Sequence, residues 1–249
     1  MSADGHTPLV LLHGWGMGPE VFADWRPWLE PRREVRCPAW SRRLEPSGSS
    51  HPGEPLAATA ASVADGVDGP AHWVGWSLGG LIALAAARVR PAAVGRVTLI
   101  AATPRMSAAP GWPGIDPLEL ERFRCELERE PMATHDRFLT LQVRGSEGAR
   151  SVLRTLRRAV ATDGLPSMEV LLSGLDRLLQ SDLRSDLDAL SCPVDAVLGG
   201  CDALVPPAVA TCLEALDVPA RVIPGAGHAP FISHPSVVTD AVLDTGVTS

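Results

Sequence analysis

Residues 72–81 read His-Trp-Val-Gly-Trp-Ser-Leu-Gly-Gly-Leu, and this stretch is the most informative part of the sequence about the fold. Its short apolar start predicts a strand, and the Ala- and Leu-rich pattern over 78–89 predicts a helix. Gly-x-Ser-x-Gly alone is a weak pattern, but between a strand and a helix it predicts a sharp turn that exposes Ser77 above a sheet. The new helix N-terminus then offers unpaired N–H groups to a developing oxyanion. The alternative is a serine that only caps the helix.

Five further short runs have the same apolar character and are bounded by turn residues. They cover residues 8–14, 34–40, 96–104, 193–200 and 221–227. Runs of this kind are typical of buried parallel strands. Because helical stretches alternate with them, the sequence predicts an α/β fold with a mostly parallel sheet and helices on both faces.

The middle of the chain breaks this alternation. From about 106 to 183 the periodicity is helical, with candidate helices at 117–130, 133–143, 146–160 and 167–180. A helical block between two β-rich parts predicts a cap over the carboxyl edge of the sheet, where pockets of such folds lie. We therefore expect core residues 1–105, a cap insertion at 106–185, and core residues 186–249.

Composition limits the function classes. The chain has 249 residues and a formal net charge of −7, enough for one sizeable core. It contains no Lys, which excludes a P-loop lysine and Schiff-base chemistry, and no Asn. The acidic balance argues against general nucleic-acid binding, and five cysteines without a C-x-x-C pair suggest neither a disulfide framework nor a zinc site. Without a signal peptide or a long apolar run, we expect a cytoplasmic protein that does not enter a membrane.

A nucleophilic serine needs a base and a group that orients the base. In folds of this type the order along the chain is serine, acid, histidine. Asp202 follows one predicted strand and His228 follows the last one, so both are expected above the same sheet edge as Ser77. His228 would take the serine proton, and Asp202 would hold its tautomer. The alternatives are an ordinary turn aspartate and a loop histidine; His234 is the lesser base candidate.

The turn His13-Gly14-Trp15-Gly16 follows the first predicted strand. Such a turn can bring the Trp15 backbone N–H to the oxyanion beside that of Leu78, with the indole lining the pocket. We expect His13 to support the turn. These residues predict a serine hydrolase that forms an acyl-enzyme and needs no metal or cofactor.

The motifs together are more specific than any one of them. LLHGWGM (11–17), WVGWSLGGL (73–81), WPGI (112–115), RFLTLQ (137–142) and GHAPFISHP (227–235) resemble the α/β-hydrolase superfamily and, within it, the pimeloyl-[acyl-carrier protein] methyl ester esterases of biotin synthesis. The resemblance runs from about Pro8 to the C-terminus. It implies a cytoplasmic carboxylesterase with the triad Ser77, Asp202 and His228, oxyanion donors Trp15 and Leu78, and pocket residues Phe138 and Gln142.

Two departures from that family pattern stand out. Relatives carry an Asp-x-Pro-Gly-x-Gly loop where this chain has Cys37 to Arg42. We expect this change to alter the shape of the pocket more than the chemistry of the triad. The segment before the first predicted strand is short, which leaves little room for a leading hairpin, and an edge strand is expected to be absent.

The cap is basic in an acidic protein. Residues 133–158 hold six arginines and two acids, a local charge of +4. Arg150, Arg154, Arg157 and Arg158 are spaced to lie on one face of a predicted helix. Acyl carrier proteins are acidic and carry a phosphate-bearing arm that Arg binds well. We expect Arg137, Arg150 and Arg154 to form a docking site for such a carrier on a monomeric enzyme; the alternative is a solvated helix face.

The sequence leaves two other function classes open. One is a different hydrolase on the same scaffold, such as a generic short-chain carboxylesterase or a carbon–carbon bond hydrolase, because a fold does not determine a function. The other is a non-catalytic binding protein with this fold. Acyl-chain length, and whether carrier-bound or free esters are used, do not follow from these motifs.

Overall fold

A computed structural model describes residues 7–40 and 56–243. Its centre is a six-stranded sheet in the order β2-β1-β3-β4-β5-β6, with every neighbouring pair parallel. The strands are β1 (Leu9–Leu12), β2 (Val35–Arg36), β3 (Ala71–Trp76), β4 (Val94–Ile100), β5 (Val194–Gly199) and β6 (Ala220–Ile223). All six lie within or overlap the predicted runs. The predicted parallel α/β sheet is therefore confirmed.

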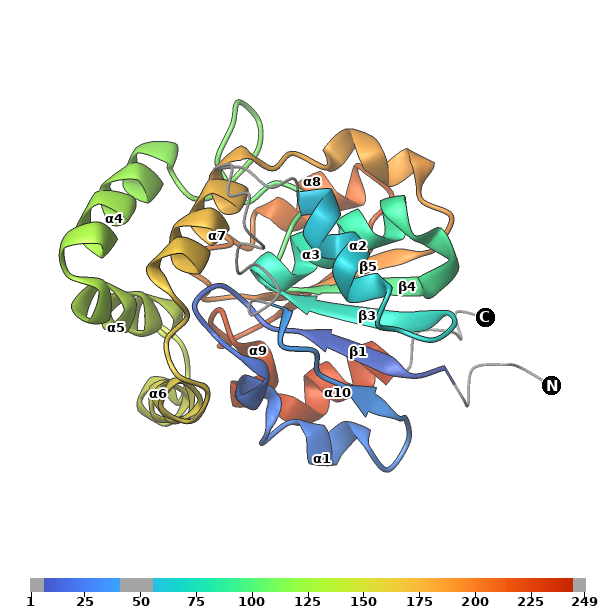
Figure 1. The fold of residues 1–249 in the computed structure, drawn as a ribbon, viewed down its shortest axis with the longest axis horizontal. Helices are drawn as coiled ribbons and strands as arrows, with labels where there is room; N and C mark the ends of the chain where they lie inside the picture. The colour runs from blue at the N-terminus through green and yellow to red at the C-terminus, as the bar shows by residue number, and fades with distance from the viewer. Residues whose placement is uncertain (1–6, 41–55, 244–249) are drawn as a thin grey trace.

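Helices cover both faces of the sheet (Figure 1). In β1 every residue is buried, and alternate side chains enter two different hydrophobic clusters: Val10 and Leu12 join one, Leu9 and Leu11 the other. This alternation is the two-residue period of a strand, and burial of both faces explains why the run is apolar throughout. The first cluster includes residues of α2 (Leu56–Ala64), α3 (Leu78–Val89) and α8 (Val209–Glu214); the second includes residues of α1 (Arg26–Leu29), α9 (Pro230–Ser233) and α10 (Pro235–Leu243).

Four helices lie between β4 and β5, to one side of the sheet in Figure 1. They are α4 (Pro117–Arg129), α5 (Pro131–Gln142), α6 (Ala149–Asp163) and α7 (Met168–Gln180). Their ends follow local rules: Asp116 caps α4 by accepting from the Leu118 N–H, Ser167 caps α7, and α6 is bounded by Gly148 and Gly164 at positive φ. The four predicted helices are thus present. The division into core and cap at residues 105 and 185 stays a prediction.

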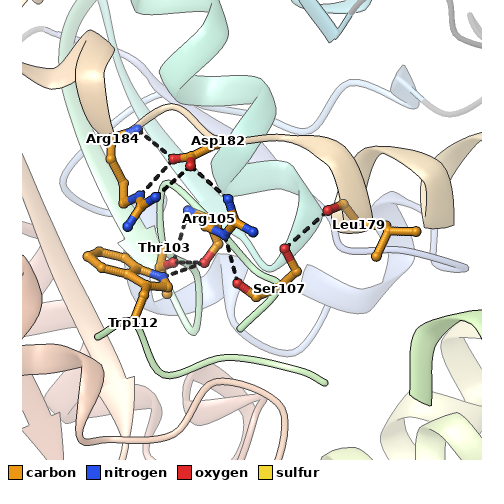
Figure 2. Close-up of polar contacts among 7 residues, drawn as sticks. All are labelled: Thr103, Arg105, Ser107, Trp112, Leu179, Asp182 and Arg184. Carbon is orange, nitrogen blue, oxygen red and sulfur yellow. Dashed lines mark hydrogen bonds and ion pairs between the residues drawn. The ribbon is translucent and has the colours of Figure 1, made fainter. Parts of the chain in front are cut away.

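The two connections between sheet and cap are tied to each other (Figure 2). Arg105, after β4, donates to Asp182, after α7, over 2.8 Å, and Arg184 donates to the same carboxylate over 2.6 Å. The Trp112 indole donates to the Arg105 carbonyl at 2.8 Å, and the Arg184 guanidinium lies 5.1 Å from the Trp112 ring centre. We call Arg105, Trp112, Asp182 and Arg184 the hinge cluster. It fixes where the cap enters and leaves the sheet edge.

Two predicted strands end earlier than their apolar runs. β2 has two residues where seven were predicted, because Pro38 follows and has no N–H for a further ladder bond. β4 ends at Ile100 because Ala101 turns the chain with φ 45°. The short 3-10 helices are η2 (Pro19–Phe22), η4 (Pro91–Ala93) and η5 (Arg184–Ala189). Among the described residues, no helix is both long and apolar enough to cross a membrane.

Candidate active site

Ser77 stands in a strained turn between β3 and α3. Its φ of 54° and ψ of −123° are rare for a residue with a side chain, and it is buried. The Ser77 N–H donates to the Ile100 carbonyl at 3.0 Å, which ties the turn to the end of β4. A methyl group on Gly75 would stand 2.5 Å from the Gly80 nitrogen, and one on Gly79 would collide with the Leu12 carbonyl. The two motif glycines are therefore needed for close backbone approach.

Asp202 and His228 are in direct contact. Nδ1 of His228 lies 2.8 Å from Oδ2 of Asp202, and the side chains are 1% and 0% exposed. The other Asp202 oxygen accepts from the backbone N–H groups of Leu204 and Val205 at 2.8 and 3.0 Å. Because the carboxylate accepts from Nδ1–H, Nε2 of the neutral ring is left as a proton acceptor. Nε2 has no hydrogen-bond partner among the described residues.

The position of His228 is held from two sides. Its carbonyl accepts from the Trp76 indole at 2.7 Å, and its N–H donates to the Gln142 carbonyl at 2.9 Å. Trp76 precedes Ser77 in the sequence, and Gln142 ends α5. The strand that carries the serine and the cap helix thus both locate the histidine. The loops of Asp202 and His228 are also joined, through the Cys201 N–H and the Ala226 carbonyl at 2.8 Å.

The predicted oxyanion turn lies against the serine. A methyl group on Gly14 would be 3.1 Å from the Ser77 Cβ, which places the start of this turn beside the nucleophile position. Leu78 is the first residue of α3, so its N–H belongs to the group that has no intrahelical acceptor. The Trp15 indole donates to the Leu171 carbonyl in α7 at 2.8 Å, so its side chain is anchored in the cap.

His13 supports this turn, as expected. Its ring stacks on Trp40 with centroids 4.8 Å apart, and the Trp40 indole donates to the His13 carbonyl at 3.0 Å. Burial lowers the pKa of His13 to about 4, so the ring is neutral near pH 7. Trp40 comes from the loop that departs from the family pattern. Residues 41 and 42 of that loop lie outside the described part of the chain.

A cavity of about 430 Å³ contains both Ser77 and His228. Its walls are mainly apolar and come from the loop after β4, the cap helices and the loop after β5; they include Met106, Ile115, Leu120, Phe123, Phe138, Leu141, Leu175, Leu178 and Leu204. Phe138 lines it, as the resemblance implied. Trp15 and Gln142 are buried and do not line it; Trp15 packs edge-on against Phe138 at 4.9 Å. Their predicted substrate-binding role stays a prediction.

Several residues of this site had no signal in the sequence. Arg144 lines the cavity although no motif contains it. His135 lacks a sequence pattern, yet its Nε2 lies 2.9 Å from the Gly16 carbonyl and links α5 to the oxyanion turn. Nε2 of His234, the lesser base candidate, lies 3.9 Å from Oε2 of Glu147, and this histidine does not line the cavity. A second cavity of about 440 Å³, beside η2 and the α6–α7 connection, contains none of the candidate catalytic residues.

The three arginines predicted to dock a carrier protein differ in their surroundings. Arg137 pairs with Glu126 at 2.9 Å. Arg150 and Arg154 are exposed on α6 and form no ion pair with any described residue. Their neighbours on this helix, Arg157 and Arg158, pair with Asp136 and Asp24. Unpaired positive charge on α6 is therefore limited, within the described structure, to Arg150 and Arg154.

The comparison with known proteins agrees with this geometry. The model of a family described as "Alpha/beta hydrolase family" matches residues 9–241. The pimeloyl-[acyl-carrier protein] methyl ester esterase of Pectobacterium carotovorum is 40% identical over 96% of this chain and 94% of its own length. The protein of that name from Methylococcus capsulatus is 38% identical over 94% and 92%. The chain belongs to the α/β-hydrolase family and, within it, to the pimeloyl-[acyl-carrier protein] methyl ester esterase family.

Solved structures of other α/β-hydrolases share the fold of this family member. An esterase from Exiguobacterium antarcticum has a TM-score of 0.80 with 18% identity, covering 96% of this chain and 91% of its own. A bromoperoxidase from Bacillus anthracis has a TM-score of 0.78 with 21% identity, covering 96% and 91%. At such identities the likeness concerns the fold alone.

Proposed function

We propose that this α/β-hydrolase is a serine carboxylesterase that converts the methyl ester of pimeloyl-acyl-carrier protein into pimeloyl-acyl-carrier protein and methanol. The observation that carries the proposal is the 40% identity, over nearly the whole chain, to a relative named for this reaction. The buried Asp202–His228 pair, in one cavity with Ser77, supports it independently. In this proposal the enzyme is a cytoplasmic monomer and uses no metal or cofactor.

The first half of the reaction forms an acyl-enzyme. Ser77 Oγ attacks the ester carbonyl carbon while its proton passes to Nε2 of His228, and Asp202 stabilises the resulting imidazolium. The backbone N–H groups of Leu78 and Trp15 bind the oxyanion of the tetrahedral intermediate. When this intermediate collapses, the C–O bond to the methoxy group breaks and His228 gives its proton to the leaving methanol.

The second half returns the free enzyme. A water molecule gives a proton to Nε2 of His228 and attacks the acyl carbonyl carbon. The bond to Ser77 Oγ breaks, the serine regains its proton from His228, and the product leaves with a free carboxylate. The apolar walls of the cavity suit the methylene chain of a pimeloyl group.

The decisive experiment is hydrolysis of pimeloyl-acyl-carrier protein methyl ester by the wild type and by Ser77→Ala. We expect turnover that disappears in the variant. If the wild type cleaves p-nitrophenyl esters through Ser77 but leaves the carrier-bound ester intact, the protein is a generic carboxylesterase and the proposed substrate is rejected. If a fluorophosphonate probe fails to label Ser77, the protein is not a serine hydrolase.

Docking of the carrier protein is part of the same proposal. Arg150 and Arg154 offer unpaired positive charge to an acidic partner, and Arg137 can exchange its exposed ion pair, because such pairs contribute only about 0–1 kcal/mol. We expect the double variant Arg150→Glu and Arg154→Glu to raise KM for the carrier-bound ester and to leave small esters unaffected. The matched charge control is the double variant Arg88→Glu and Arg221→Glu, because both arginines are exposed and lie outside the four cap helices. Equal losses on both substrates would reject the docking site.

A further inference from the structure

Apart from Ser77 and His228, the side chains that line the active-site cavity are apolar with three charged exceptions. Asp116 and Glu119 come from the start of α4, and Arg144 comes from the connection between α5 and α6. Among the described residues, Arg144 is the sole arginine that lines this cavity. A permanently charged group at the wall of a chamber for an uncharged ester requires an explanation that the ester chemistry does not give.

The guanidinium of Arg144 has no partner in the described structure. Its side chain is exposed and forms no ion pair with a described residue. Two other arginines of the cap are paired, Arg124 with Asp176 at 2.8 Å and Arg157 with Asp136 at 2.7 Å. Its backbone is fixed, since the N–H donates to the Leu141 carbonyl at 3.2 Å. The cation is thus held at the cavity wall with its hydrogen-bonding groups available.

The two acids restrict where an anion can bind. Asp116 is committed to α4, where Oδ1 accepts from the Leu118 N–H at 2.9 Å, and Glu119 lies in the same first turn. Both carboxylates repel an anion from the α4 side of the cavity, and Arg144 attracts it to the α5 side. A ligand that fits this arrangement is apolar along its length, has an ester at Ser77, and has an anionic group at some distance from the ester.

We propose that Arg144 is a specificity-determining residue that binds an anionic group of the substrate remote from the scissile ester. The inference rests on the proposed function, because it takes Ser77 as the point of ester cleavage. An arginine fork binds carboxylate and phosphate equally well in geometry. The anion is therefore either the second carboxylate of a free dicarboxylic acid monoester or the phosphate of the arm that joins an acyl group to a carrier protein.

A structural role for Arg144 makes a different prediction. A cation just after the C-terminal end of α5 also interacts favourably with the helix dipole. Loss of that interaction alone would change stability and affect all substrates alike. Loss of an anion contact instead raises KM for anionic substrates and leaves kcat unchanged, because the contact is made before and during the reaction alike.

Four methyl esters of increasing complexity separate these possibilities. Methyl heptanoate has no anion, monomethyl pimelate has a carboxylate, and the methyl ester of pimeloyl-pantetheine has a neutral arm. The methyl ester of pimeloyl-4′-phosphopantetheine adds the phosphate. Steady-state kinetics are measured on the full chain for the wild type, Arg144→Gln and Arg144→Lys. The matched control is Arg122→Gln, an exposed arginine of α4 that does not line the cavity.

For Arg144→Gln we expect KM to rise about tenfold or more for an anionic ester, the loss of one charge-assisted hydrogen bond. The two uncharged esters should stay within about twofold of the wild type, and Arg144→Lys should recover part of the loss. A rise for monomethyl pimelate alone identifies the carboxylate, and a rise for the phosphopantetheine ester alone identifies the phosphate. Equal changes on all four esters, or none, overturn the inference.

The outcome is distinguishable from failure of the proposed function. If the wild type does not hydrolyse the carrier-bound ester but Arg144→Gln raises KM for monomethyl pimelate selectively, the carrier-bound substrate is wrong and the anion site stands. If the carrier-bound ester is hydrolysed and Arg144→Gln treats charged and neutral esters alike, the proposed function stands and the anion site is wrong.

Discussion

Nδ1 of His228 lies 2.8 Å from Oδ2 of Asp202, and the second oxygen of that carboxylate accepts two backbone N–H groups. The three bonds leave the carboxylate no freedom to rotate. They also assign one tautomer to the histidine, with Nδ1 protonated and Nε2 able to accept a proton. This tautomer is the one that general-base catalysis through Nε2 requires.

Asp202→Asn should therefore inactivate the enzyme without unfolding it. The amide oxygen can still accept from the N–H groups of Leu204 and Val205, but its NH2 group then faces Nδ1 and favours the wrong tautomer. By analogy with other serine triads we expect kcat to fall about 10⁴-fold. The check is p-nitrophenyl acetate hydrolysis, with Asp217→Asn, an exposed residue at φ 56°, as control. Retention of a tenth of the activity would mean that another group orients His228.

Ser77 allows activity and stability to be separated. Its backbone angles are unfavourable for any residue with a Cβ, and strain of this kind costs about 1–3 kcal/mol. Both Ser77→Ala and Ser77→Gly should abolish hydrolysis. Glycine relieves the strain, although it also gains entropy in the unfolded chain, so we expect Ser77→Gly to be more stable than Ser77→Ala by about 1 kcal/mol. Urea denaturation measures this difference; equal stabilities would indicate an unstrained turn.

The sequence predicted those parts of the molecule that local rules determine. Apolar runs predicted the strands, helical periodicity predicted the four helices between β4 and β5, and the order Ser77, Asp202, His228 along the chain anticipated the contact between the last two. It did not predict contacts between distant segments where neither segment carries a motif. Arg144 belongs to no motif, and its place on the cavity follows from how α5 packs over the sheet edge.

Charge was the property that sequence spacing described least well. Helical spacing places four arginines of α6 on one face, but two of them pair with Asp136 and Asp24. Asp24 lies 134 residues from its partner Arg158 in the chain, so the local sequence gives no sign of this pairing. The loop at 37–40 is another place where a contact between distant segments has no signal in the sequence. It departs from the family pattern, yet its Trp40 stacks on His13 behind the oxyanion turn.

His72 makes the fold sensitive to acid. Its Nε2–H donates to Thr98 Oγ1 at 2.8 Å, and Thr98 donates to Asp195 at 2.8 Å. Burial, with a smaller contribution from the nearby Arg96 and Arg33 charges, lowers the pKa of His72 to about 3. His13, with its pKa lowered to about 4, behaves in the same way. Both histidines are neutral in the folded protein throughout the range in which they become charged in the unfolded chain.

The sign of the pH effect follows from these lowered values. Well above pH 6.5 His13 and His72 are neutral in both the folded and the unfolded state, so their burial does not reduce the free energy of unfolding. As the pH falls through 6.5, these two histidines become protonated in the unfolded chain but stay neutral in the folded protein. The free energy of unfolding therefore decreases until the pH reaches their pKa values in the folded state. We expect the free energy of unfolding to drop by about 1.4 kcal/mol per pH unit for His72 and by the same amount for His13. Urea denaturation between pH 7 and 4.5 tests this, and His72→Gln should reduce the slope; an unchanged slope would contradict the assignment.

Asp182 should control how firmly the cap is attached. It accepts from Arg105 at 2.8 Å and from Arg184 at 2.6 and 2.8 Å, and these two arginines hold the pKa of its carboxyl well below the usual range (Figure 2). Asp182→Asn removes the charge and keeps an acceptor. We expect a loss of about 1 kcal/mol, as for a network of partly exposed ion pairs. Because Arg105 and Arg184 lie in the two cap connections, trypsin should cleave there faster in Asp182→Asn than in the wild type. The control Asp217→Asn should be cleaved at the wild-type rate.

The KM for ester substrates should also rise in Asp182→Asn, since Met106, which lines the cavity, directly follows Arg105. Unaltered cleavage at both arginines, measured by mass spectrometry of the fragments, would mean that the hinge cluster does not restrain the cap.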